Sequence, residues 1–451
     1  MSSSSDGGPT VAVKLFIDKE KRRVLFAESD KEFVDVLFSF LTLPLGRIVR
    51  LFDKQSQVGC LDELYKSVES LGEGHFQAKA CKAMLLSPLN AAAAHCHRLQ
   101  VKVDDSNPVY HCKNKECNYT WYRYSSTPYA VCRCRNVVEY AGEWEDINRG
   151  AVLGDSNEDG GFVISHSKFI ITDDPQVSLA STRVMFSLMD QFGIPGNGNI
   201  EEKVLQLNSA KMTRLLRRAM LTKQPLTGLC FSVAIAPNAT YLCKLHENLL
   251  AEQAAEATDP NFKAIKVRLV QTKDNTSVLY AEVGQDFVDL AFGLLCIPVG
   301  TIMKTFSHLP QNGCMGNLYR SVVGSVKEEC QGVLLTPKVA PFFRCTSNVL
   351  QVEELAGRQI VARRCFEMNP RSLTDTTVRA YIKSTPIKFM VTNDLQIMPL
   401  SLTNTIQLLH ASNIPKNKLV EKEVTLNKSQ VLKIVRAAFE TREALSTALL
   451  P

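Results

Sequence analysis

Residues 13–46 have the sequence VKLFIDKEKRRVLFAESDKEFVDVLFSFLTLPLG, and residues 267–300 have the sequence VRLVQTKDNTSVLYAEVGQDFVDLAFGLLCIPVG. The second stretch follows the first at a constant offset of 254 residues, with no gap in the alignment. Both contain Phe-Val-Asp followed by Pro-x-Gly at the same distance. Self-similarity at a fixed offset indicates a duplicated structural unit, so the chain is one unit present twice.

The match between the two copies extends beyond this stretch. Gly59-Cys60 corresponds to Gly313-Cys314, and Phe169-Ile-Ile-Thr-Asp-Asp174 corresponds to Phe389-Met-Val-Thr-Asn-Asp394. Between these landmarks the first copy carries about 29 extra residues. The sequence therefore predicts a disordered tail at 1–10, a first repeat at 11–250 with a Cys-rich insertion at about 105–145, a linker at 251–262 and a second repeat at 263–451.

Hydrophobic periodicity predicts the elements of each copy. Alternating apolar residues predict a β-hairpin at 13–28, and apolar residues at helical spacing predict a helix that ends by Pro44. Further helices are expected from Leu45 and at 61–71. After the insertion, the pattern predicts a strand at 168–172, a helix at 177–192, a strand at 203–207 and a helix at 209–221. The expected fold is α+β, with two homologous tandem domains and a small zinc-ribbon-like insertion in the first.

Composition excludes several classes of protein. The 451 residues include 45% hydrophobic and 22% charged residues, which is ordinary for a globular chain with a buried core. A net charge of +6 is too weak an excess to indicate nucleic-acid binding by itself. The apolar run at 287–303 is interrupted by Asp289, Pro298 and Gly300, so we expect a core helix and no membrane span. With no secretory signal at the N-terminus, the expected location is intracellular, either cytoplasmic or nuclear.

The insertion holds a cluster of cysteines. Cys112, Cys117, Cys132 and Cys134 lie within 23 residues, and four thiolates can hold one zinc ion in a closed tetrahedral site. The single residue between Cys132 and Cys134 departs from the usual two-residue spacing, so His111 or Cys81 is an alternative ligand and a decayed site with free thiols is a second interpretation. A closed site leaves no position for substrate, so the predicted Zn²⁺ is structural.

Aromatic and basic residues are concentrated around these cysteines. Trp121, Arg123, Arg133 and Arg135 lie in the same segment, a composition that single-stranded nucleic-acid binders use for stacking and phosphate contacts. The alternative is that the aromatic residues pack around the metal site and dock the insertion on its parent domain, because about forty residues cannot bury a core of their own.

Catalytic signatures are absent from the sequence. It contains no nucleophile elbow, phosphate-binding loop, dinucleotide-binding glycine turn or His-Glu-x-x-His helix. Asp35 and Asp289 recur in both copies and could act as acids or bases, although satisfied structural carboxylates are the default interpretation. The favoured hypothesis is a non-enzymatic interaction or scaffold protein with an unidentified protein partner. A nucleic-acid binder is the alternative, and an enzyme with its pocket between the two copies is third. The oligomeric state does not follow from the sequence.

The motifs above together resemble the plant proteins grouped as domain of unknown function 674. The resemblance rests on the hairpin, the Phe-Val-Asp helix, Leu-Pro-Leu-Gly, Gly-Cys-Leu, Leu-Leu-Ser-Pro and the Phe-Ile-Ile-Thr-Asp-Asp strand, and extends from about Val11 to the C-terminus. It implies a duplicated, intracellular protein and no known reaction. It also implies Cys-Pro-x-Cys-Gly in relatives where this chain has Cys132-Arg133-Cys134.

Overall fold

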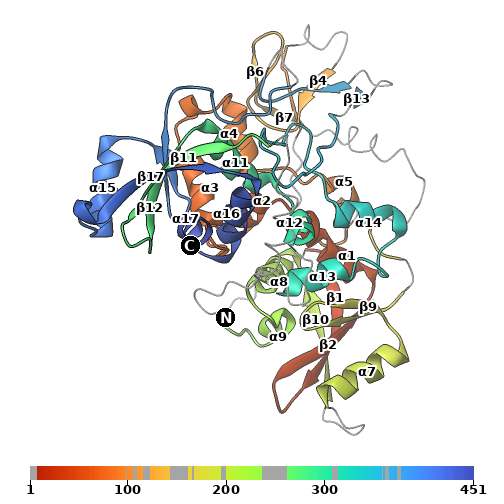
Figure 1. Cartoon of the computed structure of the whole chain (residues 1–451). Coiled ribbons are helices and arrows are strands. Elements are labelled where there is room, and N and C mark those ends of the chain that lie inside the picture. Colours follow the sequence, from red (N-terminus) through yellow and green to blue (C-terminus); the bar gives the residue numbers. More distant parts are fainter. Residues whose placement is uncertain are drawn as a thin grey trace, which may run out of the picture.

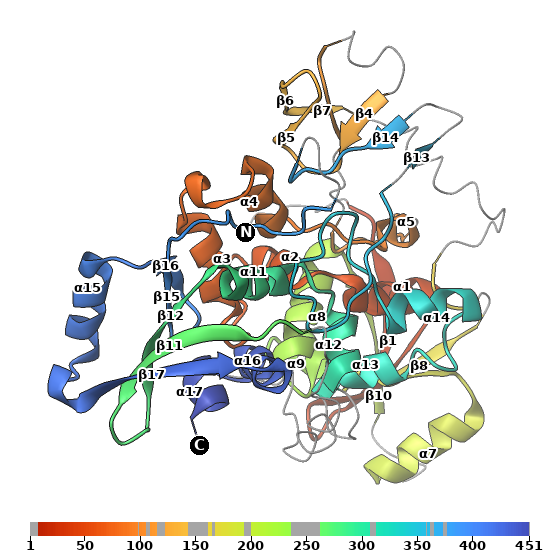
Figure 2. The ribbon, with the colours of Figure 1, turned by 45° about the horizontal axis from the view of Figure 1, so that its top comes forward.

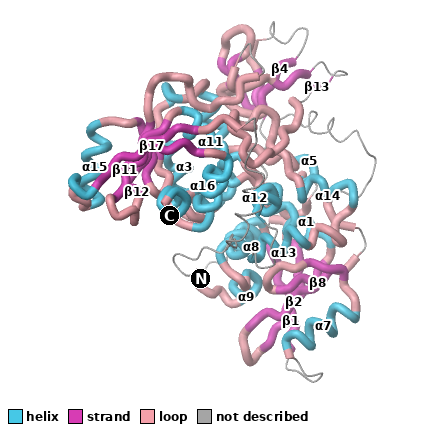
Figure 3. Tube along the Cα trace, viewed as in Figure 1, coloured by secondary structure: helices cyan, strands magenta, loops and turns pink. Residues whose placement is uncertain are grey.

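The structure, a computed structural model, describes most of the chain. The described residues are 8–97, 99–104, 109–114, 122–142, 161–164, 167–193, 200–235, 262–306, 313–357, 359–360, 365–372 and 377–450. Within them lie helices and three five-stranded sheets (Figures 1 and 3). Residues 1–7 of the predicted tail (1–10) and residues 251–261 of the predicted linker (251–262) lie outside the described residues, and the limits of the two repeats stay a prediction.

Two of the sheets have the same antiparallel topology. The first has the order β10-β1-β2-β8-β9, and the second has the order β17-β11-β12-β15-β16. The first is built from β1 (Val11–Asp18), β2 (Arg23–Ser29), β8 (Phe169–Thr172), β9 (Val177–Leu179) and β10 (Ile200–Leu207). The second is built from β11 (Ile265–Thr272), β12 (Val278–Val283), β15 (Phe389–Thr392), β16 (Ile397–Pro399) and β17 (Leu419–Leu426). The α+β class predicted from the sequence is therefore confirmed, with one antiparallel sheet for each copy.

The helices follow the same order in both copies. The first copy contains α1 (Lys31–Ser39), the 3-10 turn η1 (Phe40–Thr42), α2 (Leu45–Leu51), α3 (Leu61–Ser70), η2 (Glu73–His75), α4 (Lys79–Leu86), α5 (Ala93–Cys96), α7 (Thr182–Phe192), α8 (Ser209–Leu221) and α9 (Pro225–Cys230). The second contains α11 (Gln285–Gly293), η4 (Leu294–Cys296), α12 (Val299–Phe306), α13 (Gly313–Arg320), α14 (Glu328–Leu335), α15 (Leu402–Ser412), η6 (Lys416–Lys418), α16 (Lys428–Glu440) and α17 (Ala444–Leu449). The predicted core helix at 287–303 is thus split into α11, η4 and α12, and it is buried.

One prediction is wrong in part. The helix expected at 177–192 begins only at Thr182, because residues 177–179 form β9 at the edge of the first sheet. Ser181 has an extended backbone, and its side chain accepts a hydrogen bond from Val184 N, which starts the helix there. The strand exists because β8 offers an unpaired edge, which periodicity along the chain does not reveal.

The two copies exchange helices. At the crossing, Pro44 and Pro298 lie opposite one another, where Leu45 N donates to Ile297 O and Val299 N donates to Leu43 O, both at 3.0 Å. Helix α3 then contacts β16 and α11 of the second copy, whereas α13 contacts α8 and α1 of the first. In Figure 1, α3 and α4 accordingly lie beside the second sheet, and α12 and α13 lie beside the first.

Paired contacts secure this exchange. Cys60 Sγ donates to Thr441 O at 3.2 Å, and the corresponding Cys314 Sγ donates to Thr222 O at 3.1 Å. A continuous hydrophobic cluster runs through both halves and includes residues of both copies. Smaller clusters cover the outer faces of the sheets beneath α7 and α15. Each copy therefore contributes buried side chains to the core around the sheet of the other copy.

Two aspartates at corresponding positions in α1 and α11 bind backbone amides of a later segment of their own copy. Asp35 Oδ1 accepts from Phe162 N and Val163 N, and Asp289 Oδ1 accepts from Tyr381 N and Ile382 N. Burial raises the pKa of Asp35 to about 6 and that of Asp289 to about 7. Each carboxylate thus accepts two backbone hydrogen bonds, as the interpretation of a satisfied carboxylate predicts.

Candidate metal centre

The Cys-rich insertion forms a small module beside the second half. In Figure 2 it stands apart from the two main sheets. Its sheet has the order β13-β14-β4-β3-β7. The strands are β3 (Val109–His111), β4 (Tyr122–Ser125) and β7 (Tyr140–Gly142) from the insertion, with β13 (Gln359–Ile360) and β14 (Cys365–Glu367) from the second copy. A hairpin of β5 (Ala130–Val131) and β6 (Val137–Val138) lies beside it.

Backbone geometry brings three cysteines together. Cys112 directly follows β3, and Cys132 and Cys134 lie in the turn between β5 and β6. This turn closes with Cys132 N donating to Asn136 O at 2.9 Å and Arg135 N donating to Cys132 O at 2.8 Å. Arg135 has a φ of 64°, a left-handed conformation that lets the turn fold back tightly.

The three sulfur atoms are spaced as metal ligands would be. All lie within 4.8 Å of one another, and Cys112 Sγ and Cys134 Sγ are 3.4 Å apart. A tetrahedral zinc ion with bonds of about 2.3 Å separates its thiolates by about 3.8 Å, so the cluster has the right dimensions. Cys112 and Cys132 are buried, and Cys134 is half-buried. Burial raises the pKa of the Cys112 thiol, and a bound cation would oppose that effect.

The other predicted site residues have different places. Cys117 and Trp121 lie outside the described residues. Arg133 and Arg135 are exposed on the hairpin turn, whereas Arg123 lies over the ring of Phe366, 5.5 Å from its centroid. Of the predicted residues, the structure brings together Cys112, Cys132 and Cys134, which could bind a metal.

Sequence reasoning missed the contribution of the second copy to this module. Strand β14 pairs in parallel with β4, and Met368 N donates to Tyr124 O at 2.8 Å. The buried Glu367 accepts from Ser126 Oγ at 2.7 Å, and Met368 packs against the cysteines. Strand β14 is only three residues long, so no periodic signal could have identified it.

The first copy also contacts the module. Lys79, at the start of α4, lies over the ring of Tyr129 at 4.4 Å from its centroid. Tyr129 N donates to Val138 O at 2.9 Å, which connects this contact to the β5–β6 hairpin. The module is therefore attached through both copies, and its three clustered cysteines lie on the side of the hairpin turn.

Comparison with known proteins identifies the family of this chain. The family model described as Protein of unknown function (DUF674) matches residues 7–429. The chain belongs to the DUF674 family. The match covers both sheets and the cysteine module of this DUF674 protein, so it supports the resemblance derived from the motifs. No curated protein and no solved structure matches the chain.

The hydrophobic helices of this DUF674 protein are short. Among the helices that the structure describes, none combines the length and the apolar character needed to cross a bilayer.

Proposed function

We propose that this DUF674 protein is a non-enzymatic intracellular interaction protein, cytoplasmic or nuclear, whose cysteine module is shaped by one structural zinc ion. The ligands in this proposal are Cys112, Cys117, Cys132 and Cys134. The main support for this zinc site is that three of these thiols lie within 4.8 Å of one another. With four protein ligands a zinc ion has no open coordination position, so the ion would stabilise the module and not activate water.

A structural ion suits a module of this size. Its strands have two to four residues, and the small hydrophobic cluster around the thiols includes Val138 and Met368. A sheet this small gains little free energy from burial, and metal binding supplies what the core lacks. The surface around the thiols is open to a partner, because Arg133, Arg135 and Val137 are exposed.

Native mass spectrometry of the full chain, purified with zinc present, tests the metal. We expect one zinc per chain, lost in Cys112→Ser and in Cys132→Ser and retained in Cys230→Ser, whose thiol lies outside the cluster. Cys117→Ser tests the fourth ligand in the same way. A zinc-free wild-type chain, or zinc retained in Cys112→Ser, would contradict the proposal.

Photo-crosslinking in cells tests the interaction. A photoreactive residue at position 137 on the hairpin should give a discrete adduct, and the same residue at position 204 on the exposed strand β10 should not. We expect Cys132→Ser to abolish the adduct at position 137, because the hairpin turn loses its metal. An adduct that is unchanged in Cys132→Ser would show that the interaction does not depend on the zinc site of the module.

Nucleic-acid binding through the module is the second candidate function. The observation in its favour is the exposure of Arg133 and Arg135 beside the thiols. It predicts affinity for single-stranded oligonucleotides that falls steeply with salt and is weakened by Arg133→Ala, Arg135→Ala and Trp121→Ala, with Arg123→Ala weaker in effect because its guanidinium stacks on Phe366. Fluorescence anisotropy at low ionic strength decides, since absence of binding there removes this candidate.

A further inference from the structure

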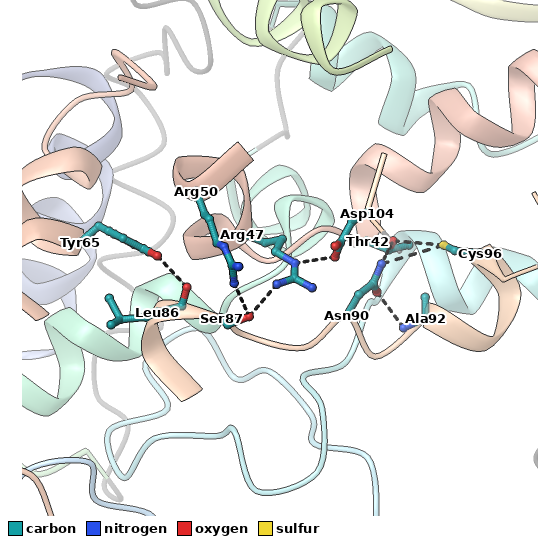
Figure 4. A network of polar contacts seen from close by, with 10 residues as sticks. All are labelled: Thr42, Arg47, Arg50, Tyr65, Leu86, Ser87, Asn90, Ala92, Cys96 and Asp104. Atoms are coloured by element: carbon teal, nitrogen blue, oxygen red, sulfur yellow. Dashed lines mark hydrogen bonds and ion pairs between the residues drawn. The ribbon is translucent and has the colours of Figure 1, made fainter. Parts of the chain in front are cut away.

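Two arginines of α2 converge on one hydroxyl at the end of α4 (Figure 4). Nη1 of Arg47 donates to Ser87 Oγ at 2.6 Å, and Nη1 of Arg50 donates to the same oxygen at 2.9 Å. The two arginines are three residues apart, so α2 presents both on one face. Arg47 is 3% exposed, whereas Arg50 is exposed and Ser87 is half-buried.

The charges at this point favour an anion. Asp104 Oδ2 accepts from Nε of Arg47 at 2.6 Å, and Arg50 adds a second guanidinium group at Ser87. Ser87 Oγ is neutral, and the two arginines occupy both of its lone pairs. Two cations held at one neutral oxygen repel each other, and a dianion there would replace that repulsion with charge-assisted hydrogen bonds. Arginine is also the residue best suited to phosphate geometry.

The backbone at Ser87 fits a modified residue. Ser87 caps the end of α4 with φ −140° and ψ 63°, outside the helix, and Pro88 follows it. The carbonyl of Leu86 accepts from the Tyr65 hydroxyl at 2.7 Å, which holds the chain at this point (Figure 4). The hydroxyl is therefore held in position facing the two arginines by backbone on its N-terminal side.

We propose that Ser87 is a phosphorylation site whose phosphate is bound by Arg47 and Arg50. A proline-directed protein kinase would transfer the γ-phosphoryl group of ATP to Ser87 Oγ. The new P–O bond forms as the bond to the β-phosphate oxygen breaks, ADP leaves, and the hydroxyl proton passes to the base of the kinase. Nε of Arg47 points to Asp104, so the phosphate can use Nη1 while this ion pair persists.

The second copy provides an internal control. Thr336 corresponds to Ser87, and Thr301 and Lys304 stand where the first copy has Arg47 and Arg50. Thr336 Oγ1 donates to Gly332 O at 2.9 Å, and Thr301 Oγ1 donates to Pro337 O at 3.3 Å. The second copy thus has no arginine at either position, and a phosphate there would meet a different environment.

A phosphate at Ser87 would stabilise the region of the fold to which the cysteine module is attached. Arg47 lies just after the crossing at Pro44, and Asp104 belongs to the segment that leads to β3. A dianion bound to α2 at the end of α4 would connect the crossing, α4 and this segment more firmly. Since α4 also carries Lys79 against Tyr129, the phosphate would stabilise the side of the second half on which the module rests.

Genetically encoded phosphoserine in the full-length chain tests the binding of the phosphate. We expect phosphoserine at position 87 to raise the Tm by about 2 °C, and its phosphate to have a second pKa about one unit below the usual value of about 6 by phosphorus NMR. Arg50→Gln, an exposed change that preserves folding, should abolish most of both shifts. Phosphoserine at position 336 should show neither.

Two further measurements distinguish a covalent from a free phosphate. Treatment of the folded chain with a proline-directed kinase and ATP should modify Ser87, as shown by peptide mass spectrometry, and leave the Ser87→Ala chain unmodified at this segment. An ordinary pKa for phosphoserine 87, or an equal pKa in Arg50→Gln, would overturn the proposal. So would a Tm gain in the unmodified chain with inorganic phosphate that is lost in Arg50→Gln, because the site would then take a free anion.

Discussion

The two copies make equivalent contacts where they pack into each other, and they differ at the cysteine module and in the side chains of α2. Asp35 and Asp289 each accept from two backbone amides, and Cys60 and Cys314 donate to the corresponding carbonyls of Thr441 and Thr222 across the exchange. The differences include the cysteine module and the two arginines of α2, where the second copy has Thr301 and Lys304. The comparison teaches that the mutual packing of the copies restricts substitution, since each buried contact constrains both halves.

A tight backbone approach beside the crossing of the two copies gives the largest of the expected effects. A Cβ at Gly300 would lie 2.7 Å from Leu334 O and 3.0 Å from Leu41 O, whereas one at Gly46 would lie 3.1 Å from Leu295 O and Leu85 O. We expect Gly300→Ala to lower the free energy of unfolding by about 3 kcal/mol and Gly46→Ala by about 1 kcal/mol. Urea unfolding measures both. Gly332→Ala, which meets nothing within 4 Å in α14, should be neutral or stabilising.

The duplicated aspartates predict a pH dependence that differs between the halves. Folding raises the pKa from 3.8 to about 7 for Asp289 and to about 6 for Asp35, chiefly by burial. A raised pKa means that the folded state binds the proton more tightly. The resulting stability is fully present below about pH 4 and is lost as the pH rises through the folded pKa.

Asparagine at these positions should therefore flatten the curve of unfolding free energy against pH. We expect Asp289→Asn to flatten it from about pH 4 to pH 7 and Asp35→Asn over a range that ends about one unit lower, since Asn keeps the Oδ1 acceptor in each case. Denaturant unfolding at a series of pH values measures this. Asp190→Asn, at an exposed position of α7, serves as the control. Parallel curves for all variants would refute the assignment.

Two serines at corresponding positions each accept one hydrogen bond from the other copy, so their substitution measures single contacts of the helix exchange. Ser67 Oγ accepts from Ile397 N at 2.8 Å, and the corresponding Ser321 Oγ accepts from Val177 N at 2.9 Å. Ser67 is buried and Ser321 is half-buried, so water can replace the second contact more readily. We expect Ser67→Ala to cost about 2 kcal/mol and Ser321→Ala about 1 kcal/mol by urea unfolding. A larger cost for Ser321→Ala would contradict the burial argument.

The smallest expected effect concerns the cysteine module, whose insertion belongs to the first copy and whose sheet is completed by β14 of the second. Ser126→Ala removes the hydrogen bond to Glu367 and so loosens β4 from β14. We expect the amide of Met368 to exchange with solvent roughly fivefold faster, with global stability unchanged. Ser187→Ala, on the exposed side of α7, serves as the control. An unchanged exchange rate would mean that the strands pair without this contact.

Local patterns account for much of the fold. The hairpins, α2, α3, α8 and the duplicated order of elements follow from periodicity and from the offset of 254 residues. Cys112, Cys132 and Cys134 were selected by spacing alone, and the structure brings them together. The strand β9 was missed because its pairing partner is an edge of the sheet, not a neighbour in sequence.

The sequence by itself determined that the unit is duplicated and that each copy is α+β, and it predicted a cluster of cysteines that could bind a metal, because these depend on residue type and on spacing along the chain. Only the tertiary structure decided that α3 and α13 pack in the opposite halves, that β14 completes the sheet of the module, and that Arg47 and Arg50 meet at Ser87. Contacts between residues separated by 37 to 330 positions carry no local periodic signal. They form only when two surfaces of complementary shape and charge meet.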